Sequence, residues 1–316
     1  MRVAVLDDYQ SVALKVADWS PLEGRAALTV FSDHVRDEGA LVERLAPFEI
    51  VCVMRERTAL PRRVIERLKR LKLIASTGPI NAAIDTKAAE EHGIEVVHTG
   101  YSSTPTIELT WALILASQRH LVEETASLRS GGWQQRLGGD LRGRTLGLLG
   151  LGNIGGEVAR IGRAFGMTVI GWSQNLTPEK AKAVGALLVS KERLFAEAHI
   201  LSIHTLLSRR TRGLVDASAL GAMKHTAWLI NTSRGAIVDE AAVLDALRRR
   251  SIAGFAVDVF DEEPLPEGHP FRSLDNVLAT PHLGYVTEGL YKVFYTDVVR
   301  NIVEWLDRGT AAPAHL

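Results

Sequence analysis

The feature that most constrains the fold is a glycine-rich stretch in the middle of the chain, TLGLLGLGNIGGEVARIGRAFGMTVIGW at 145–172. Gly150, Gly152 and Gly155 form the motif G-x-G-x-x-G, which follows a strand-like apolar run, opens a helix-length segment and precedes a second apolar run. In this context the first glycine permits a tight turn, the second lets a pyrophosphate approach the backbone, and the third lets the helix pack against the strand. The stretch therefore predicts a strand–turn–helix–strand unit that binds a dinucleotide on the N–H groups of the helix start. A glycine-rich turn that binds nothing is the alternative.

Short apolar runs alternate with helix-length amphipathic segments along the whole chain, which is the pattern of parallel sheets covered by helices. A chain of 316 residues exceeds what one hydrophobic core usually organises, so we expect two domains. The expected strands are 3–6, 28–31, 50–53, 73–75, 94–97, 145–149, 168–172, 186–189, 200–204, 227–231, 254–259 and 276–279.

The pattern changes near residue 100, where a long helix is expected to begin. Thr104 could cap this helix and Pro105 suits its first position. The last helix, expected at 287–307, has an apolar face that could cover either domain, and the sequence leaves that choice open.

Composition excludes several classes of partner. The chain has 37 basic and 37 acidic residues, which gives no reason to invoke nucleic acid or an anionic membrane. The apolar run of the N-terminus is too short for a signal peptide, and no stretch approaches the length that spans a bilayer. The single cysteine, Cys52, lies in an apolar run and is expected to be a buried structural thiol rather than a nucleophile. We therefore expect a cytoplasmic protein.

Three kinds of polar side chain follow expected strands of the second half, and ligands of open α/β sheets bind beyond the carboxyl ends of strands. They are Arg234, a carboxylate from Asp258 or the run 261–263, and His282. Singly, each is explained by a surface charge or a polar turn. Together they suit hydride transfer to a 2-keto acid: arginine holds the carboxylate and polarises the carbonyl, histidine supplies the proton, and a carboxylate stabilises the protonated imidazole.

The motifs INTSRGAIVDE, AVDVFDEEP and TPHLG follow the glycine loop in that order. With the loop they resemble the D-isomer-specific 2-hydroxyacid dehydrogenases, including phosphoglycerate dehydrogenase-like and glyoxylate or hydroxypyruvate reductase-like members, over essentially the whole chain. The resemblance implies that Arg234 binds and polarises the substrate, that Glu263 is the partner of the histidine, and that His282 is the general acid/base.

The resemblance also implies an organisation. Two Rossmann-like α/β domains are expected, each a mostly parallel sheet covered by helices: a discontinuous substrate domain of residues 1–99 plus 287–316, and a dinucleotide-binding domain of residues 100–286. The family places the catalytic cleft between the domains and forms homodimers through the cofactor domains. No metal is expected.

The expected cofactor is NAD, with NADP as the alternative. Ser173 stands where the family commonly has the Asp that grips the ribose hydroxyls, and serine neither grips both hydroxyls nor repels a 2′-phosphate. No arginine follows it, so a phosphate would depend on hydroxyl and amide donors or on Lys180 or Lys182; weak discrimination is expected. The expected cofactor-binding residues are Gly150, Gly152, Asn153, Ile154, Gly155, Ser173, His204, Thr232, Asp258 (at the nicotinamide carboxamide) and His282.

The substrate loop departs from the family pattern T-G-x-G-x-D-N-I-D, whose backbone N–H groups hold the substrate carboxylate. Gly78 matches, but Pro79 narrows the backbone options and Ile80 replaces the second glycine. Tyr285 replaces a small residue after the histidine, and Arg55 matches a position that contacts substrate in some members. The expected substrate-binding residues are thus Arg55, Gly78, Ile80, Arg234 and Tyr285, and apolar or aromatic 2-keto acids are weakly favoured.

Two alternatives remain. A nucleotide-sensing corepressor-like protein of the same fold would bind the cofactor tightly without turnover, since fold alone does not decide function. An enzyme of another substrate class would turn over only carbonyl compounds that are not acids.

Overall fold

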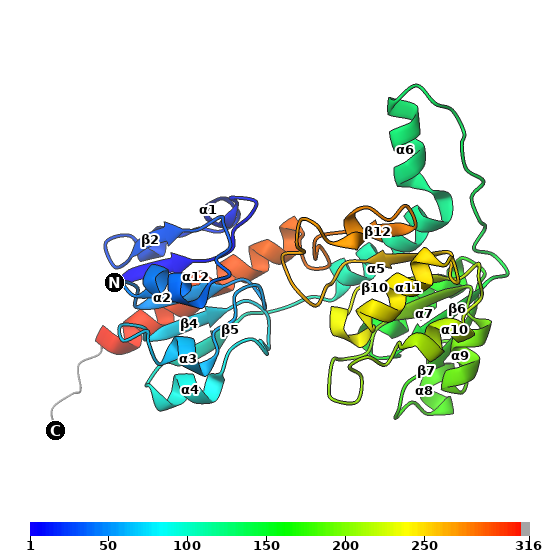
Figure 1. Cartoon of the computed structure of the whole chain (residues 1–316). Helices are drawn as coiled ribbons and strands as arrows, with labels where there is room; N and C mark the ends of the chain where they lie inside the picture. The colour runs from blue at the N-terminus through cyan, green and yellow to red at the C-terminus, as the bar shows by residue number, and fades with distance from the viewer. Residues whose placement is uncertain (311–316) are drawn as a thin grey trace. The chain divides into compact units, whose positions relative to one another are not determined.

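The structure is a computed structural model that describes residues 1–310, and it divides into two compact units (Figure 1). Unit 1 comprises Met1–Ser102 with Thr287–Leu316, and unit 2 comprises Ser103–Val286. Each unit is a parallel sheet covered by helices, and both ends of the chain contribute to unit 1. The predicted fold class is confirmed. Residues 311–316 of the expected C-terminal segment lie outside the described residues.

Unit 1 contains a five-stranded sheet with the order β2-β1-β3-β4-β5. Every strand pair described in it is parallel, so the carboxyl ends of its strands share one edge. Its strands are β1 (Arg2–Val5), β2 (Ala27–Val30), β3 (Ile50–Val53), β4 (Leu73–Ser76) and β5 (Glu95–His98), and its helices are α1 (Ala13–Val16), η1 (Ser20–Leu22), α2 (Glu38–Leu45), α3 (Arg62–Ile65), α4 (Thr86–Glu91) and α12 (Glu288–Thr310).

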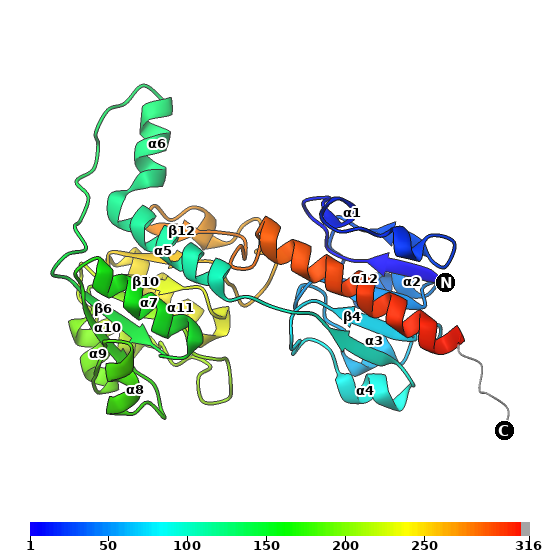
Figure 2. The same ribbon diagram turned by 180° about the vertical axis from the view of Figure 1, so that it is seen from behind.

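The last helix, α12, covers unit 1, which the sequence left open. It packs on β4 and β5 and beside α1 and η1, and Figure 2 shows it running along this sheet. Phe294, Val298 and Ile302 are fully buried at helical spacing, so one continuous apolar face of α12 forms this contact.

Unit 2 contains a seven-stranded parallel sheet with the order β12-β11-β10-β9-β6-β7-β8. Within unit 2 the chain first forms β6, β7 and β8 in adjacent order, and it then forms β9 on the other side of β6. The boundary between β6 and β9 is therefore a topological switch point. The strands are β6 (Thr145–Leu149), β7 (Thr168–Trp172), β8 (Leu187–Leu188), β9 (Ile200–Ile203), β10 (Trp228–Asn231), β11 (Gly254–Val257) and β12 (Val277–Ala279). The helices are α5 (Thr104–Arg119), α6 (Leu121–Arg129), α7 (Asn153–Ala164), α8 (Pro178–Ala183), α9 (Lys191–Glu197), α10 (Ala217–Ala222), η2 (Gly235–Ile237), α11 (Glu240–Arg248) and η3 (Pro270–Arg272).

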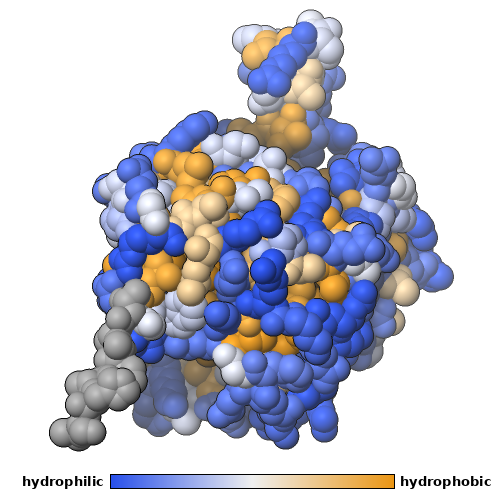
Figure 3. Space-filling view, turned by 90° about the vertical axis from the view of Figure 1, so that its left-hand side faces the viewer, coloured by the Kyte–Doolittle hydropathy of each residue, from blue (hydrophilic) through white to orange (hydrophobic). Residues whose placement is uncertain are grey.

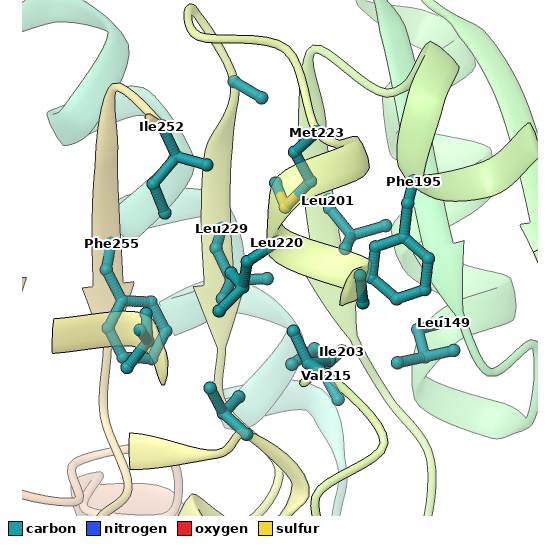
Figure 4. Close-up of a cluster of buried hydrophobic side chains, with 14 of the residues drawn as sticks. Leu149, Phe195, Leu201, Ile203, Val215, Leu220, Met223, Leu229, Ile252 and Phe255 are labelled. Carbon is teal, nitrogen blue, oxygen red and sulfur yellow. The ribbon is translucent and has the colours of Figure 1, made fainter. Parts of the chain in front are cut away.

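One face of the unit 2 sheet is buried by side chains from the strands and from α9, α10 and α11. Leu149, Leu201, Leu229 and Phe255 point from four strands into this cluster, where Phe195 meets them from α9 (Figure 4). All five are at most 2% exposed, so the strand ends that carry polar residues are anchored in a packed core.

The start of α5 differs from the sequence prediction. Ser103, not Thr104, is the residue before the helix, and Pro105 is the second helical residue rather than the first. Ser103 already has helical φ and ψ angles (−84° and −10°) and makes no side-chain hydrogen bond to the helix. The expected cap is therefore wrong, because Thr104 is itself the first helical residue and the residue before it lacks the extended backbone of a capping residue.

Cys52 is a buried free thiol, as predicted, and burial raises its pKa to about 12. Within the described residues, no helix is both long and apolar enough to span a membrane.

Candidate active site

The glycine loop joins β6 to α7 as a close-packed turn. Gly150 has φ of +105°, and a Cβ on it would lie 2.7 Å from the carbonyl carbon of His204. A Cβ on Gly155 would lie 2.1 Å from the carbonyl oxygen of Gly150, so this glycine lets the helix approach the turn. By contrast, a Cβ on Gly152 would meet no described atom within 4 Å. The second glycine thus faces open space at a helix start, which fits a cradle for a phosphate.

The other predicted cofactor residues lie at the same edge of unit 2. Asn153 and Ile154 begin α7, and their N–H groups are among those that a helix leaves unpaired at its start. His204 follows β9; burial lowers its pKa to about 3, so it stays neutral, and its Nε2 lies 2.9 Å from Ser202 Oγ. Ser173 directly follows β7 and is half-buried.

Arg234 is placed by a hydrogen-bonded turn after β10. Asn231, fully buried at the strand end, accepts from the N–H of Ser233 and donates to the carbonyl of Arg234. The hydroxyl of Ser233 donates to the carbonyl of Thr205 at 2.6 Å, and the guanidinium of Arg234 donates to the carbonyl of Ser233 at 2.8 Å. These contacts connect the turn to the segment that follows the neighbouring strand β9, so they fix the backbone position from which the side chain of Arg234 extends.

His282 and Glu263 form a hydrogen-bonded pair. Nδ1 of the imidazole lies 2.5 Å from Oε2 of the carboxylate, and the side chains are 23% and 30% exposed. The other carboxylate oxygen of Glu263 accepts from the N–H of Phe260 at 2.9 Å. Burial alone would raise the pKa of Glu263, but the hydrogen bond and charge of His282, with smaller contributions from Phe260 and Arg234, lower it below its usual value. Glu263 is therefore ionised at neutral pH. Arg234, Glu263 and His282 follow the neighbouring strands β10, β11 and β12, so the three predicted catalytic residues lie at one edge of the unit 2 sheet.

Asp258 holds the turn that carries His282. Its fully buried carboxylate accepts from Thr280 Oγ1 at 2.6 Å and from the N–H groups of Leu283 at 2.7 Å and Gly284 at 2.8 Å. Burial raises the pKa of Asp258 although these bonds oppose the shift. His282 has a left-handed backbone with φ of +53°, a conformation that such surrounding contacts must stabilise. A contact of Asp258 with the nicotinamide stays a prediction.

Sequence reasoning missed two threonines of α5 that support this edge. Thr106 donates to the carbonyl of Gly284 at 2.8 Å, and Thr110 pairs with the hydroxyl of Thr232 at 2.8 Å. Both are buried. Two polar residues four positions apart in an otherwise apolar helix are the signal that could have revealed them, because they lie on one face.

The predicted substrate-binding residues divide between the units. Arg234 and Tyr285 belong to unit 2, where the ring of Tyr285 is 4% exposed and meets the ring of His282 edge-on at 5.1 Å between centroids. Arg55, Gly78 and Ile80 belong to unit 1. Ile80 is 73% exposed, so its side chain fills no space within its own unit.

Known proteins are similar to this chain in both sequence and fold. Residues 111–284 match the family described as D-isomer specific 2-hydroxyacid dehydrogenase, NAD binding domain. The chain is 44% identical to glyoxylate reductase of Aeropyrum pernix over 234 residues, which is 71% of this chain and 70% of that protein. It is 35% identical to D-3-phosphoglycerate dehydrogenase of Methanocaldococcus jannaschii over 99% of this chain, but it spans only 58% of the length of that protein. The crystal structure of phosphoglycerate oxidoreductase from Vibrio cholerae o395 matches with a TM-score of 0.93 at 39% identity, over 98% of this chain and 99% of that one. The chain therefore belongs to the D-isomer specific 2-hydroxyacid dehydrogenase family.

Proposed function

We propose that the protein is a nicotinamide-dependent dehydrogenase that interconverts a 2-keto acid and a D-2-hydroxy acid. The observation that carries this proposal is the hydrogen-bonded pair of His282 and Glu263, on a turn that Asp258 fixes, at the edge that also holds Arg234 and the glycine loop. A protein that only sensed the cofactor would not need an imidazole whose charge a neighbouring carboxylate supports.

The roles of the side chains follow from their contacts. Because Nδ1 of His282 is bound to Glu263, Nε2 is the nitrogen left to exchange a proton with the substrate oxygen. Glu263 stabilises the imidazole when it is protonated, before it donates in the reductive direction or after it accepts in the oxidative one. Arg234 holds the substrate carboxylate and polarises the carbonyl. The nicotinamide ring, when bound, supplies or accepts the hydride.

The experiment that tests this function is a turnover assay with NADH or NADPH and a panel of carbonyl compounds. We expect cofactor oxidation that depends on a 2-keto acid, and the panel sets apolar and aromatic acids against small polar ones such as glyoxylate and hydroxypyruvate. Tight cofactor binding without turnover across the panel would favour the corepressor-like alternative. Turnover only with carbonyl compounds that are not acids would favour the other enzyme class.

We propose NAD as the cofactor, with NADP also accepted. Ser173 at the end of β7 carries no charge, and the exposed Gln174 and Asn175 follow it. The ratio of kcat/KM for the two reduced cofactors tests this, and a preference beyond roughly a hundredfold, about 2.7 kcal/mol, would contradict weak discrimination. Ser173→Asp should shift the ratio toward NADH because the new carboxylate repels a 2′-phosphate.

We also propose that the protein is a homodimer through an arm of unit 2. The arm is α6 with the segment up to residue 140, and it extends from the body of its unit (Figure 1). None of the residues of α6, all of which the structure describes, is buried. Apolar side chains are exposed along the arm, which is at the top of Figure 3: Leu121, Val122, Leu128, Trp133 and Leu137. An exposed apolar surface of this kind fits an interface between copies of one chain, and sedimentation of the wild type against a Leu128→Glu variant tests it.

A further inference from the structure

The Glu263 loop, residues 258–269, joins β11 to η3, and the turn after the neighbouring strand β10 supports its first half. A Cβ on Gly235 would lie 2.3 Å from the carbonyl carbon of Phe260, so the loop packs directly on this glycine. Gly235 comes immediately after Arg234 in that turn. The backbone beside Arg234 therefore supports the loop at Phe260, whose N–H is the one that binds the carboxylate of Glu263.

Arg272, at the end of η3, holds the second half of the Glu263 loop. Its Nη2 donates to the carbonyl of Leu265 at 2.7 Å, and its Nε donates to the carbonyl of Pro266 at 2.9 Å. Two consecutive carbonyls thus accept from one planar guanidinium, an arrangement that the ammonium of a lysine cannot reproduce. Because these carbonyls follow Glu263 closely in the chain, the arginine fixes the backbone on that side of the carboxylate.

His269 fixes the end of the same loop. Its Nδ1 accepts from the N–H of Phe271 at 3.2 Å, and its Nε2 lies 3.1 Å from Oε1 of Glu240. Because Nδ1 accepts, the neutral imidazole carries its proton on Nε2 and donates it to Glu240. The ring also lies 4.7 Å from the ring of Phe271, between centroids, and Phe271 belongs to the buried core of unit 2. The end of the loop is therefore connected both to α11 and to the core.

The segment that begins with Arg234 contacts both halves of the Glu263 loop. Gly235 lies under the first half, and Glu240, the first residue of α11, binds His269 at the end of the second. The loop is thus held from two sides, and its place relative to the turn of Arg234 is set by contacts within unit 2.

These supports can affect the carboxylate of Glu263 only through its position. Besides burial, the ionisable groups that act most on the pKa of Glu263 are His282 and Arg234. Neither His269 nor Arg272 is among them. A change in either residue would therefore reach the carboxylate by moving the backbone that carries it.

We propose that Arg272 and His269 are positioning residues, which hold the Glu263 loop where its carboxylate meets the imidazole of the proton carrier. The proposal rests on the proposed function, and all of its residues belong to unit 2. The contact that depends on this placement is short, 2.5 Å from Oε2 of Glu263 to Nδ1 of His282, so a small displacement of the loop would lengthen it. A longer contact supports the charge of the imidazole less, because the attraction between opposite charges falls with distance.

The first test compares Arg272→Ala and Arg272→Lys with Arg248→Ala, which removes an exposed arginine from the end of α11. The measurement is the titration midpoint of the His282 ring signals in NMR, assigned by their loss in His282→Ala. We expect the midpoint of Arg272→Ala to move to lower pH by roughly half a unit, a fraction of what a close opposite charge contributes. Arg272→Lys should move it less, and the control should match the wild type. An unmoved midpoint in Arg272→Ala would overturn the proposal, even in a variant of lower stability, because the arginine would then be purely structural.

A second pair of variants tests His269. His269→Asn keeps an oxygen for the N–H of Phe271 but is too short to reach Glu240, whereas Glu240→Gln keeps an oxygen that accepts from Nε2. We expect His269→Asn to move the His282 midpoint to lower pH and Glu240→Gln to leave it near the wild-type value. A shift of equal size in both variants would mean that the charge of Glu240, and not the position of the loop, acts on the imidazole, which would overturn the role of His269.

Steady-state kinetics separate this proposal from the proposed function. In an enzyme that turns over 2-keto acids, Arg272→Ala should lower kcat about 3- to 10-fold with KM nearly unchanged, less than the roughly 10²-fold cost of a full 1 Å misplacement. Absence of turnover in the wild type would contradict the proposed function, and the NMR midpoints would still decide the positioning role. Turnover in the wild type with an unmoved midpoint in Arg272→Ala would contradict the positioning role alone.

Discussion

Arg55 in unit 1 and His282 in unit 2 occupy similar positions in their sheets but have opposite electrostatic surroundings. Each follows a parallel strand by two or three residues, and each has a left-handed backbone, with φ of +51° and +53°. Around His282 two carboxylates make the contacts: Glu263 holds the imidazole and Asp258 holds the turn. Around Arg55 the hydrogen bonds and the ring contact are to neutral groups, a hydroxyl, a carbonyl, an amide and an aromatic ring, and the carboxylate of Glu56 lies 3.7 Å from its Nη2.

The difference matches what each group would have to do. A proton carrier changes its charge in every turnover, so a neighbouring carboxylate that favours the charged form is useful. A cation that only binds an anion must keep its charge available, and a close carboxylate would compete with the ligand. Variants of His282 should therefore alter kcat and its pH dependence, whereas variants of Arg55 should alter mainly KM.

The largest effect is expected for His282→Ala. Removal of the proton carrier should lower kcat by about 10²–10⁴-fold, the usual worth of general acid–base catalysis. Cofactor affinity should change little, because the glycine loop is untouched, and titration of NADH fluorescence checks this. A variant with near-wild-type kcat would remove His282 from the mechanism and end the contrast with Arg55.

Arg234→Lys should follow, because Arg234 combines the two roles by binding the carboxylate and polarising the carbonyl. Lysine keeps the charge but loses the planar fork, so we expect kcat/KM to fall roughly 10- to 100-fold. This variant should change both kcat and KM in steady-state kinetics. A change only in the thermal midpoint of unfolding would make Arg234 structural.

Glu263→Gln should have a smaller effect that shows mainly in the pH–rate profile. The protonated imidazole loses its charged partner, so the limb that reports on it in the reductive direction should move to lower pH. The pKa of Glu263 is lowered in the folded protein, so its contribution to stability is present above the unfolded value of about 4.3 and is lost as the pH falls through the folded pKa. The variant should lack this pH-dependent contribution to stability when it is unfolded by acid. An unshifted pH–rate profile would indicate that Asp261 or Glu262, rather than Glu263, supports the charge of the imidazole.

The sequence predicted those parts of the structure that depend on short contiguous motifs. The glycine loop and the strand ends before Arg234 and His282 lie where local patterns indicated, since turns and strands are set by neighbouring residues. Contacts between distant segments could not be predicted. The hydrogen bond from Gly78 to Thr99 spans 21 residues and the hydrogen bond from Thr106 to Gly284 spans 178, so no local sequence pattern indicates either of them. For the same reason the sequence did not show which domain α12 covers, since its apolar face suits either sheet.

The smallest predicted effects come from removing one hydroxyl at each edge. Thr106→Val and Thr99→Val are close in shape to the wild type, and each leaves a buried backbone group without its partner, so each should lower the free energy of unfolding by about 1–3 kcal/mol. Their kinetic effects should differ. Thr106→Val loosens the turn at Gly284 and should lower kcat by a few-fold, because His282 is less well placed. Thr99→Val frees the N–H of Gly78 beside Arg55, so it should leave kcat unchanged and lower KM slightly. Denaturant unfolding with steady-state kinetics measures both quantities, and a kcat loss of equal size in the two variants would show that the edges are not distinct.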